Sequence, residues 1–513
     1  MARTSISLIA GAICVALAFP AAASMNISSA PTKNVACSAG VCTPTAKGAI
    51  LNAADLQSML AASDVTVNTG SGAVTIEITA PLAWASAHRL TLNASFNVSV
   101  KAVVAVEGTA GLTVNYSNGG DLLFFPGGKI DFWDANSSLI VNGTSHVLVN
   151  DIASMAAAYT ADNSAILALA KDYDAGPDGT YNANAVSAPM TGTFEGLGHT
   201  ISNFSAAGAG LNIGFFGQVS GGSIRDITLS NAHVASTAQG TFNHPVFVGV
   251  LAPSAGGTNI IGVHASGTAA GLTYSNVGGL LGERGVFIRS DSSVAVTCGK
   301  LSHAGGLAGA GGSFLLSHAS GTVTVGTHSA GGGLTGADPG YEAITIVQSY
   351  ATGDVTSTNP RNSVVLGGLA GAVLDTSSIT DSYALGAVRN AGVSELGGLL
   401  GYGFDNAVKN AYAAGAVGSS TASRHRKYFG TGGFLGFAQA IDRQNYVNDY
   451  WDVDTSTQTV GCGDAKHGGC AKPVGLSDAQ LKSQLPTGFD PAIWAQSASI
   501  NNGYPYLIAN PPQ

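Results

Sequence analysis

The sequence has few charged residues, and those present are more often acidic than basic. Asp, Glu, Lys and Arg make up 10% of the 513 residues, against roughly a quarter in ordinary soluble proteins. With 21 Lys and Arg against 30 Asp and Glu, the formal net charge is −9. This balance excludes general nucleic-acid binding, which needs a basic surface. At 45% hydrophobic residues, the chain is also too apolar for a disordered protein.

Long apolar segments and the common catalytic motifs are also missing. Beyond the first residues there is no run of about 20 apolar residues, so we expect no transmembrane helix in the mature chain. The chain has no Gly-x-Ser-x-Gly, no His-Glu-x-x-His and no phosphate-binding Gly-Lys-Ser/Thr. It also lacks the Gly-Gly-x-Gly-x-Asp nonapeptide of calcium-binding rolls. We therefore predict neither an enzyme nor a bound cofactor or metal.

Cysteine is scarce, with 6 residues in the chain. Four lie in two close pairs within Gly- or Pro-containing loops, Cys37 with Cys42 and Cys462 with Cys470. In an exported protein such spacing predicts two local disulfides. Cys298 is left over, and we expect it to be buried in a strand and free.

A metal site is the alternative for the last cysteine pair. Asp464 and His467 lie between Cys462 and Cys470, so Cys, Asp, His and Cys could meet in one loop. That spacing matches no established zinc framework, and the disulfide is the preferred interpretation.

The N-terminus has the pattern of an export signal. Arg3 gives a positive start, residues 6–19 are apolar, and residues 21–23 are three alanines suited to cleavage. Cys14 raises the alternative of a lipid anchor, but Ile13 before it is a poor fit to the small residue that lipidation requires. We predict a signal peptide over residues 1–23 and a secreted or cell-surface protein.

What the chain has in abundance is glycine, 70 residues, about twice the usual share of ~7%. Much of it lies in a short phrase, Gly-Gly-Leu-x-Gly or a weaker form, which returns eight times. The glycines that mark the copies are Gly214, Gly249, Gly279, Gly306, Gly333, Gly368, Gly398 and Gly433, at intervals of 27, 30 or 35 residues. A repeat of this length predicts stacked units, because one unit cannot bury its apolar face alone.

A second phrase follows each glycine phrase in register. It reads Ser-Tyr-Ala-Thr-Gly-Asp-Val at 349–355, and similar sequences start at 382 and 411. His318 and His264 take the place of the tyrosine in earlier copies, which marks them as packing or stacking positions rather than ligands. The strands are too short and too close for crossover helices. We therefore predict an all-β, right-handed parallel β-solenoid, continuous from about residue 65 to 437, with levels about 4.8 Å apart.

These phrases resemble the GLUG motif family of bacterial secreted and surface proteins. The segment 192–203 is similar to the entry segment of filamentous haemagglutinin-like exoproteins. The segments 450–452, 475–477 and 501–507 are similar to their closing segment. The resemblance implies a β-helix with an adhesin-like role.

The predicted organisation has six parts. They are a signal peptide (1–23), a flexible leader (24–50), a haemagglutinin-like β-helix (51–150), a helix and loop insertion (151–192), the GLUG-repeat solenoid (193–437) and a C-terminal capping segment (438–513). We expect short helices at 54–60 and at either 152–158 or 164–171. We expect the aromatic residues of the last part to cover the final coil: Tyr450, Trp451, Phe489, Trp494, Tyr504 and Tyr506.

Few residues suggest chemistry. Glu195 and His199, four apart in a glycine-rich turn, could form an acid–base pair, and Asp449, Asp452 and Asp454 form the densest acidic group. A structural role is the preferred interpretation of both, so no catalytic residue is predicted. The single basic run, with Arg424, Arg426 and Lys427, is best interpreted as a solvated loop, and a contact with an anionic polysaccharide is the alternative.

Two classes of function remain. We predict a secreted or surface adhesin-like protein whose extended β surface attaches to glycans, surfaces or other cells, with possible self-association. The alternative is a β-helical polysaccharide-degrading enzyme, either a lyase or a glycoside hydrolase. The two differ in whether a face of the solenoid carries a cleft with three or more converging acids and bases, and the sequence predicts that it does not.

Overall fold

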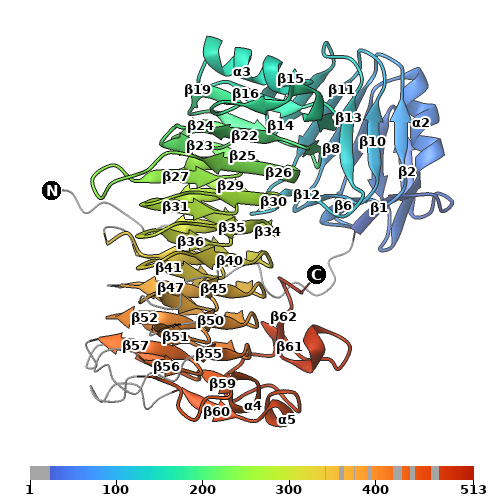
Figure 1. Ribbon diagram of the computed structural model, residues 1–513. Coiled ribbons are helices and arrows are strands. Elements are labelled where there is room, and N and C mark those ends of the chain that lie inside the picture. Colours follow the sequence, from blue (N-terminus) through green and yellow to red (C-terminus); the bar gives the residue numbers. More distant parts are fainter. Residues whose placement is uncertain are drawn as a thin grey trace.

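Parallel sheets of short strands dominate the molecule (Figure 1). The computed structural model describes residues 24–340, 343–357, 363–374, 376–390, 392, 394–419, 430–439, 445–463 and 473–512. Strands make up 48% of the structure and helices 7%, so the prediction of an all-β fold with long parallel sheets is confirmed. No described helix is long and apolar enough to cross a membrane.

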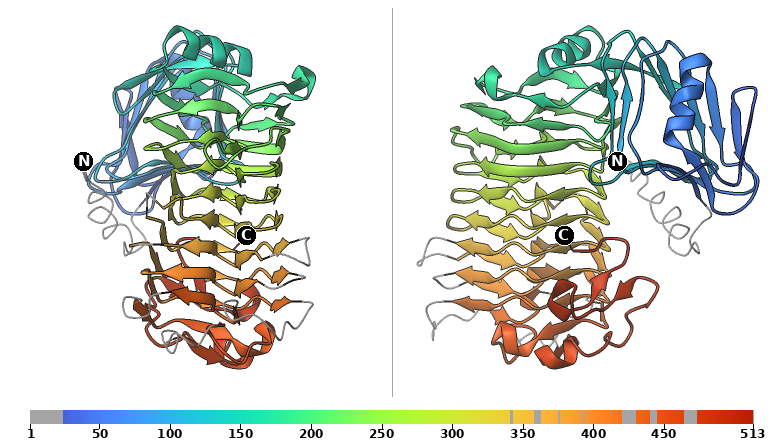
Figure 2. Two further views of the ribbon diagram at one scale, coloured as in Figure 1. Left: turned by 60° about the vertical axis from the view of Figure 1, so that its left-hand side comes forward. Right: turned by 90° about the vertical axis from the view of Figure 1, so that its right-hand side faces the viewer.

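The coils form two stacks rather than one. An N-terminal body (residues 24–141) lies beside one end of a longer main solenoid (residues 144–463), and its strands run crosswise to those of the solenoid (Figures 1 and 2). The chain leaves the first stack through an antiparallel hairpin, in which Leu139 pairs with His146. The turn of this hairpin contains Asn142 and Gly143, both with positive φ. The prediction of one continuous solenoid is therefore wrong, because this turn reverses the chain.

The N-terminal body has three sheets around one apolar core. The first contains β1 (Ser24–Ser28), β4 (Ala49–Asn52), β6 (Thr75–Ile78), β9 (Val98–Val100) and β12 (Leu122–Phe124). The second contains β7 (Leu82–Trp84), β10 (Val103–Val106) and β13 (Lys129–Phe132). The third contains β2 (Val35–Ser38), β3 (Val41–Pro44), β5 (Val65–Asn68), β8 (Arg89–Asn93), β11 (Gly111–Asn115) and β14 (Ser138–Val141).

Residues 24–50 belong to this body, so the prediction of a flexible leader is wrong. Strand β1 lies between β4 and β6 in a parallel sheet. Its alternate residues Met25 and Ile27 are fully buried, which fits the period of two of a half-buried strand. The alternation is hard to recognise in residues 24–50 because the strands are short and rich in Ser and Thr, a composition typical of linkers.

Both predicted helices exist. Helix α2 (Ala53–Ala62) covers 54–60, and the side chain of Asn52 accepts hydrogen bonds from the first free N–H groups. Helix α3 (Ile152–Ala161) begins with a capping box between Asp151 and Ser154. The segment after α3 is not an insertion, because β16 (Ile166–Leu169) pairs with β15 (Thr144–Val149) and β20 (Thr193–Glu195) as the first level of the main solenoid.

Four stacked sheets build the main solenoid, and we name them by content. The aliphatic sheet contains β15, β16, β20, β25 (Ser223–Arg225), β29 (Asn259–Ile261), β33 (Val286–Ile288), β38 (Ser313–Leu315), β43 (Thr345–Val347), β48 (Ser378–Thr380), β53 (Ala407–Lys409) and β58 (Asn445–Val447). The first groove sheet contains β23 (Asn212–Ile213), β27 (Val246–Gly249), β31 (Ser275–Gly278), β36 (His303–Gly305), β41 (Ala330–Gly332), β46 (Val365–Gly367), β51 (Glu395–Gly397) and β56 (Thr431–Gly432). The second groove sheet contains β28 (Ala252–Ser254), β32 (Leu281–Glu283), β37 (Ala308–Ala310), β42 (Thr335–Ala337), β47 (Ala370–Val373), β52 (Leu400–Phe404) and β57 (Leu435–Gln439).

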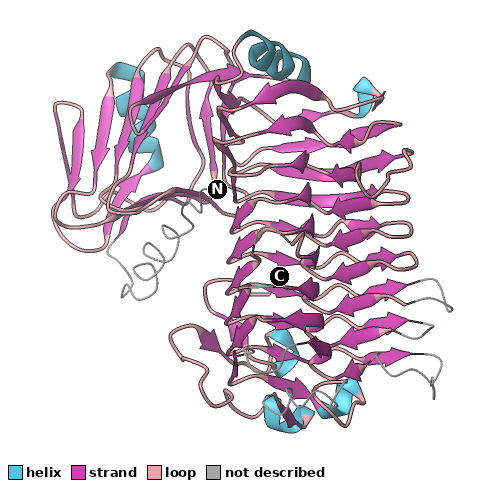
Figure 3. Ribbon diagram, turned by 90° about the vertical axis from the view of Figure 1, so that its left-hand side faces the viewer, coloured by secondary structure: helices cyan, strands magenta, loops and turns pink. Residues whose placement is uncertain are grey.

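The fourth, the tyrosine sheet, carries the second phrase of each repeat. Figure 3 shows the short strands of the main solenoid stacked in levels. It contains β17 (Tyr173–Asp174), β18 (Thr180–Tyr181), β21 (Thr200–Ser202), β22 (Ser205–Gly208), β26 (Thr228–Ser236), β30 (His264–Ala270), β34 (Asp291–Ser292), β35 (Ala295–Thr297), β39 (His318–Ala319), β40 (Val323–Val325), β44 (Tyr350–Ala351), β45 (Val355–Ser357), β49 (Tyr383–Ala384), β50 (Val388–Asn390), β54 (Tyr412–Ala413), β55 (Val417–Ser419), β59 (Tyr450–Asp452) and β60 (Val474–Leu476). A separate pair, β19 (Val186–Met190) and β24 (Phe216–Val219), lies near α3.

Four connections join the four sheets in each coil. Two of them have a constant length and two vary in length. From β29 onward, the aliphatic and tyrosine sheets are always joined by two residues, and so are the two groove sheets. The other two connections range from two residues, as between β32 and β33, to eleven, as between β55 and β56. The intervals of 27, 30 and 35 residues therefore differ only in the connections that enter the first groove sheet and leave the second.

Buried serines satisfy the backbone at the constant corner between the aliphatic and tyrosine sheets. The N–H of Ser290 donates to Oγ of Ser317, the N–H of Ser317 to Ser349, and that of Ser349 to Ser382. Each hydroxyl thus accepts a hydrogen bond from the level beside it. Since an unpaired buried N–H costs about 1–3 kcal/mol, this ladder explains why the second phrase begins with serine.

The C-terminal segment lies along the flank of the solenoid as well as near its end. Helices α4 (Val453–Ser456) and α5 (Asp478–Leu481) lie at the last coils, and β61 (Trp494–Ala495) and β62 (Tyr506–Leu507) turn back along the tyrosine sheet (Figure 1). The Tyr412 hydroxyl donates to the carbonyl of Pro505, and the amide of Asn510 donates to the carbonyl of Ser317. The sequence predicted that the C-terminal aromatic residues cover the final coil. In the structure the C-terminal segment mainly covers the stacked tyrosine rings of several successive coils.

Candidate binding groove

The two groove sheets meet at the glycine phrases, and these glycines are required by contact rather than by φ. From β31 to β51, each strand of the first groove sheet ends at the first glycine of its phrase, and the leucine after the second glycine is fully buried. A Cβ on Gly368 would lie 2.1 Å from the carbonyl oxygen of Gly398, and one on Gly371 would lie 2.2 Å from that of Gly336. Neither glycine has positive φ. The marker glycines therefore let neighbouring coils approach at the line where the sheets join.

The outward residues of the two sheets face each other across this line and form a groove along the solenoid. One wall is a ladder of residues in register, Asn212, Phe247, Asn276, His303, Ala330, Val365 and Glu395. The other is Ser254, Glu283, Ala310, Ala337, Ala372, Tyr402 and Phe437. At about 4.8 Å per level, seven levels give a groove roughly 30 Å long.

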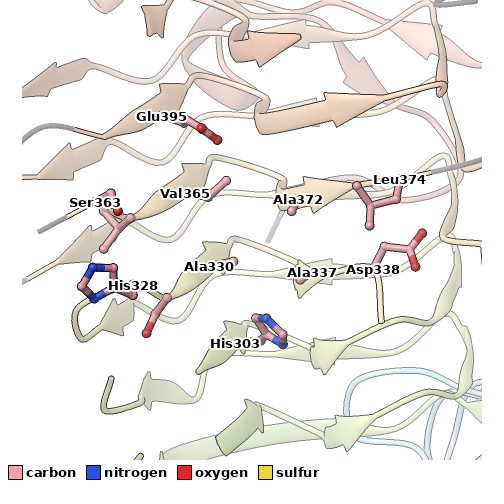
Figure 4. Close-up of a pocket in the computed structure, with 12 residues that line it drawn as sticks. His303, His328, Ala330, Ala337, Asp338, Ser363, Val365, Ala372, Leu374 and Glu395 are labelled. Carbon is pink, nitrogen blue, oxygen red and sulfur yellow. The ribbon is translucent and has the colours of Figure 1, made fainter. Parts of the chain in front are cut away.

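The half of the groove farther from α3 deepens into what we call the glutamate hollow, with a volume of about 400 Å³. Small side chains such as Ala330, Ala337 and Ala372 form its floor (Figure 4). Its titratable residues are His303, His328, Asp338 and Glu395. These four groups line different parts of the hollow and do not converge on one point (Figure 4), so the hollow is not the cleft of converging acids and bases that the enzymatic alternative requires.

Glu395 is the least compensated of these groups. No described residue donates a hydrogen bond to its carboxyl or forms an ion pair with it, and burial raises its pKa to about 7. Asp338, in contrast, accepts hydrogen bonds from the N–H of Gly340 at 2.7 Å and from Oγ of Ser377 at 3.1 Å. His303 lies 3.1 Å from Oδ1 of Asn276, and burial lowers its pKa to about 4. Near neutral pH the imidazole of His303 is therefore uncharged.

A second hollow, the amide hollow, continues the groove toward α3 with a volume of about 1000 Å³. Asn212, Phe247, Ser254 and Glu283 of the two ladders line it, so it belongs to the same groove. Its other polar residues are Asn184, Ser187, Gln218, Ser220 and Arg284. A third hollow of about 610 Å³ beside the end of α3 shares Ser187 with it. The groove thus offers mainly amides and hydroxyls in the half near α3 and the carboxyls of Asp338 and Glu395 in the other half.

The predicted acid–base candidates lie elsewhere, where the N-terminal body meets the main solenoid. The ring of His199 is fully buried, with Nδ1 3.1 Å from Oδ1 of Asp172 and Nε2 2.8 Å from the carbonyl of Ile130. This hydrogen bond holds the pKa of Asp172 below its usual range. Because both ring nitrogens bond to groups of the junction, His199 fastens the two stacks together.

Glu195 belongs to a separate charged cluster of the same junction. Its carboxyl lies 3.4 Å from Nε of Arg225, whose guanidinium also bonds to Asp121 of the N-terminal body. Arg289 bonds to the other oxygen of Asp121 at 2.6 Å. Burial raises the pKa of Glu195 and of the adjacent Asp226. These charges join one body to the other and are not open to a ligand.

The C-terminal aspartates are also structural. Asp452 accepts hydrogen bonds from the N–H groups of Asp454 and Thr455 at the start of α4, and from the hydroxyl of Tyr504 at 2.8 Å. Asp449 accepts one from the N–H of Ala411, and burial raises its pKa to about 7.

The two histidines of the second phrase, His264 and His318, each contact the residue at the same register position of a neighbouring coil. The ring of His318 stacks on Tyr350 with centroids 4.6 Å apart. His264 lies two levels away in the same ladder and pairs with Asp291, which is between them. In the described part of the chain no group of three or more His, Cys, Asp or Glu could hold a metal ion.

The cysteines and the basic run complete the predicted residues. Cys37 and Cys42 form a disulfide across the β2–β3 hairpin, and Cys298 is free and buried. Cys462 is disulfide-bonded, whereas Cys470 lies outside the described residues. Arg424, Arg426 and Lys427 also lie outside them.

No protein-family model matches the chain. Halomucin from Haloquadratum walsbyi is 34% identical over 258 residues, which cover 43% of this chain and 3% of that protein. The chain thus spans only a small part of this relative's length. A solved structure from Bacteroides ovatus, titled a "putative immunoglobulin A1 protease", is 18% identical and covers 71% of this chain and 93% of its own, with a TM-score of 0.36.

Proposed function

We propose that this chain is an exported, adhesin-like protein that binds a linear glycan along the groove. The observation that carries this proposal is the succession of hollows along the two ladders, with the amide hollow toward α3 and the glutamate hollow farther along the same solenoid. Repeated shallow contacts in register gain affinity together, although each is weak. We further propose a right-handed coil, in line with the preference of parallel crossovers.

The groove suits a glycan better than an extended peptide. Peptides that bind sheets usually add a strand to an open edge. The strands beneath the glutamate hollow, β41 and β46, each pair on both sides, so their backbone groups are already used. Recognition must then come from side chains, and the amides, hydroxyls and carboxyls of the hollows match the hydroxyl-rich surface of a sugar chain.

The alternative of a polysaccharide-degrading enzyme draws on one observation, the raised pKa of Glu395, which is a property of general acids. Its nearest acidic neighbour in the hollow, Asp338, follows a strand two levels away, about 10 Å along the axis, and on the opposite wall (Figure 4). Paired carboxyls in glycosidases lie about 5–9.5 Å apart. Both oxygens of Asp338 also accept hydrogen bonds from the protein. We therefore propose binding without cleavage.

Export and surface attachment are part of the same proposal. They are supported by the signal-like N-terminus and by the low charge of the chain. The resemblance to GLUG-motif exoproteins points the same way. Self-association through the groove would compete with the glycan.

A glycan array followed by titration calorimetry tests the proposal. Ala372→Arg would fill the floor of the groove, whereas Ala407→Arg makes the same change on an outward position of the aliphatic sheet. We expect the first variant to lose glycan binding by tenfold or more and the second to bind normally. Equal binding by both variants, or release of shorter glycans from a bound polymer, would contradict the proposal.

A further inference from the structure

Glu395 is unusual because its carboxyl lies in a hollow without a partner among the described residues. Its wall position is filled by His303, Ala330 and Val365 in the preceding coils. The residue is partly buried, and among the described residues it has no donor and no counter-ion. A carboxylate in such a place lacks the partner that would favour its charged form. A ligand can supply that partner.

The charges around Glu395 show which kind of ligand fits. Among the described residues that line the hollow there is no Lys or Arg. The acidic residues are Asp338 and Glu395, and the imidazoles are His303, held in its neutral form by burial, and the exposed His328. A polyanion would meet two carboxyls and no described cation, so the hollow disfavours uronate or sulfate polymers.

We propose that the glutamate hollow is a subsite for the ammonium group of an amino-sugar residue, with Glu395 as its ion-pair partner. This inference rests on the proposed function, since it places the amino sugar in a glycan that follows the groove. The small residues Ala330, Ala337 and Ala372 leave room for the ring beside the carboxyl. The aromatic rings of Tyr402 and Phe437, stacked with centroids 5.7 Å apart, continue the opposite wall beyond the hollow. They offer the next sugar an apolar face.

Proton release on binding is a consequence of this ion pair. At about pH 5.5 nearly all Glu395 carboxyls carry a proton, since burial raises the pKa to about 7, and the amine of the free sugar is protonated as well. An ammonium partner favours the carboxylate, so binding at this pH should release up to about one proton per site. The other titratable groups that face the hollow are His303, His328 and Asp338. His303 stays neutral at this pH, and His328→Asn serves as the control for the exposed imidazole.

Titration calorimetry with the full chain gives the test. The probes are a soluble glucosamine oligomer, its fully N-acetylated form, a neutral glucan and a polyuronate, each in two buffers of different ionisation enthalpy. We expect the glucosamine oligomer to bind tightest and to release protons. Glu395→Gln should weaken its binding by about tenfold to a hundredfold, abolish the proton release and leave binding of the N-acetylated oligomer unchanged. Glu107→Gln, a comparable glutamate of the N-terminal body, should change none of these values.

The outcomes separate this inference from the proposed function. If glucosamine and N-acetylated oligomers bind equally to the native chain and to Glu395→Gln, the subsite is wrong while groove binding stands. If the polyuronate binds tightest, the subsite is wrong as well. If no glycan binds and Ala372→Arg has no effect on any probe, the proposed function itself fails. Preferential binding of a lysine-rich peptide that is lost in Glu395→Gln would also overturn the amino-sugar assignment. Thermal unfolding of each variant confirms that the comparison is between folded proteins.

Discussion

Tyr383 stacks face to face on Tyr412, with ring centroids 5.1 Å apart and planes inclined by 10°. Tyr350 continues the stack at 4.7 Å on the other side of Tyr383. Tyrosines at one register position of successive coils must meet in this way, because the level spacing of a parallel sheet is close to the thickness of a stacked pair. The C-terminal segment covers this stack, and the indole of Trp494 contacts both Tyr383 and Tyr412.

Replacing Trp494 by alanine should loosen the C-terminal segment from the tyrosine stack. The indole is buried, and its Nε1 donates to Asp381 at 3.1 Å. We expect a loss of about 3–5 kcal/mol for this packing. Hydrogen exchange should then rise in residues 489–510 and in β49 and β54. Trp133→Ala is the matched control because Trp133 is 68% exposed; similar exchange in both variants would contradict the cover described here.

A single methyl group at a marker glycine should disturb the join between the groove sheets. In Gly368→Ala the new Cβ would lie 2.1 Å from the carbonyl oxygen of Gly398, a distance that requires the coils to move apart. We expect destabilisation by several kcal/mol, on the scale of overpacked cores, measured by denaturant unfolding. Gly418→Ala has open space around its Cβ and should unfold almost like the native protein. Equal midpoints for the two variants would rule out close approach as the reason for the phrase.

Asparagine at position 449 should stabilise the protein at alkaline pH. Burial raises the pKa of Asp449 from 3.8 to about 7, so the folded state holds a proton that the unfolded state has lost. The contribution of this group to stability is complete below pH 4 and is lost as the pH rises to about 7. Asp449→Asn keeps an oxygen for the N–H of Ala411 and cannot ionise. We expect it to gain about 4 kcal/mol at pH 8 and nothing at pH 4; a gain that is the same at both pH values would contradict this account.

Neutralising Asp121 should weaken the contact between the two stacks. Its two oxygens bond to Arg225 and Arg289 of the main solenoid, so Asp121→Asn leaves two partly buried guanidinium groups without their shared counter-ion. We expect a cost of about 1–3 kcal/mol, seen as faster proteolysis of the junction and a larger radius in solution scattering. Asp134→Asn changes an aspartate whose side chain bonds within its own turn and should leave the radius unchanged. A compact, protease-resistant Asp121→Asn protein would show that the cluster does not hold the stacks.

The repeats predicted the stacked sheets because their signal is periodic and local. The marker glycines, the serine that starts the second phrase and the tyrosine after it each recur at one register position, and each has a packing role that depends only on the neighbouring coil. The reversal at Asn142 and Gly143 was missed because a two-residue turn between apolar strands looks the same whether the next strand continues the coil or leaves it. Residues 24–50 were missed because their alternation is short and mostly polar.

The groove was missed for a different reason. A hollow depends on the angle between two sheets, which no single repeat encodes. The sequence does contain a signal for its residues, since His303 and Glu395 both stand two places before the first glycine of their phrase, where other copies have Ala330 and Val365. Polar residues at a slot otherwise filled by small or aliphatic ones mark an outward wall position. The position of Glu195 and His199 at the junction could not be predicted from the sequence. Their partners Arg225, Asp172 and Ile130 come from other coils or from the N-terminal body.

The two connections of variable length have a consequence for how such a chain can change. They supply His328, Asp338 and Leu374 to the borders of the glutamate hollow, while the constant two-residue corners hold the strands in register. Residues can therefore be added to or removed from a border loop, and whole loops exchanged between coils, with no shift in the ladders beneath. Recognition and architecture are carried by different stretches of each repeat, so a library that varies only the border loops would sample new ligands on an unaltered frame.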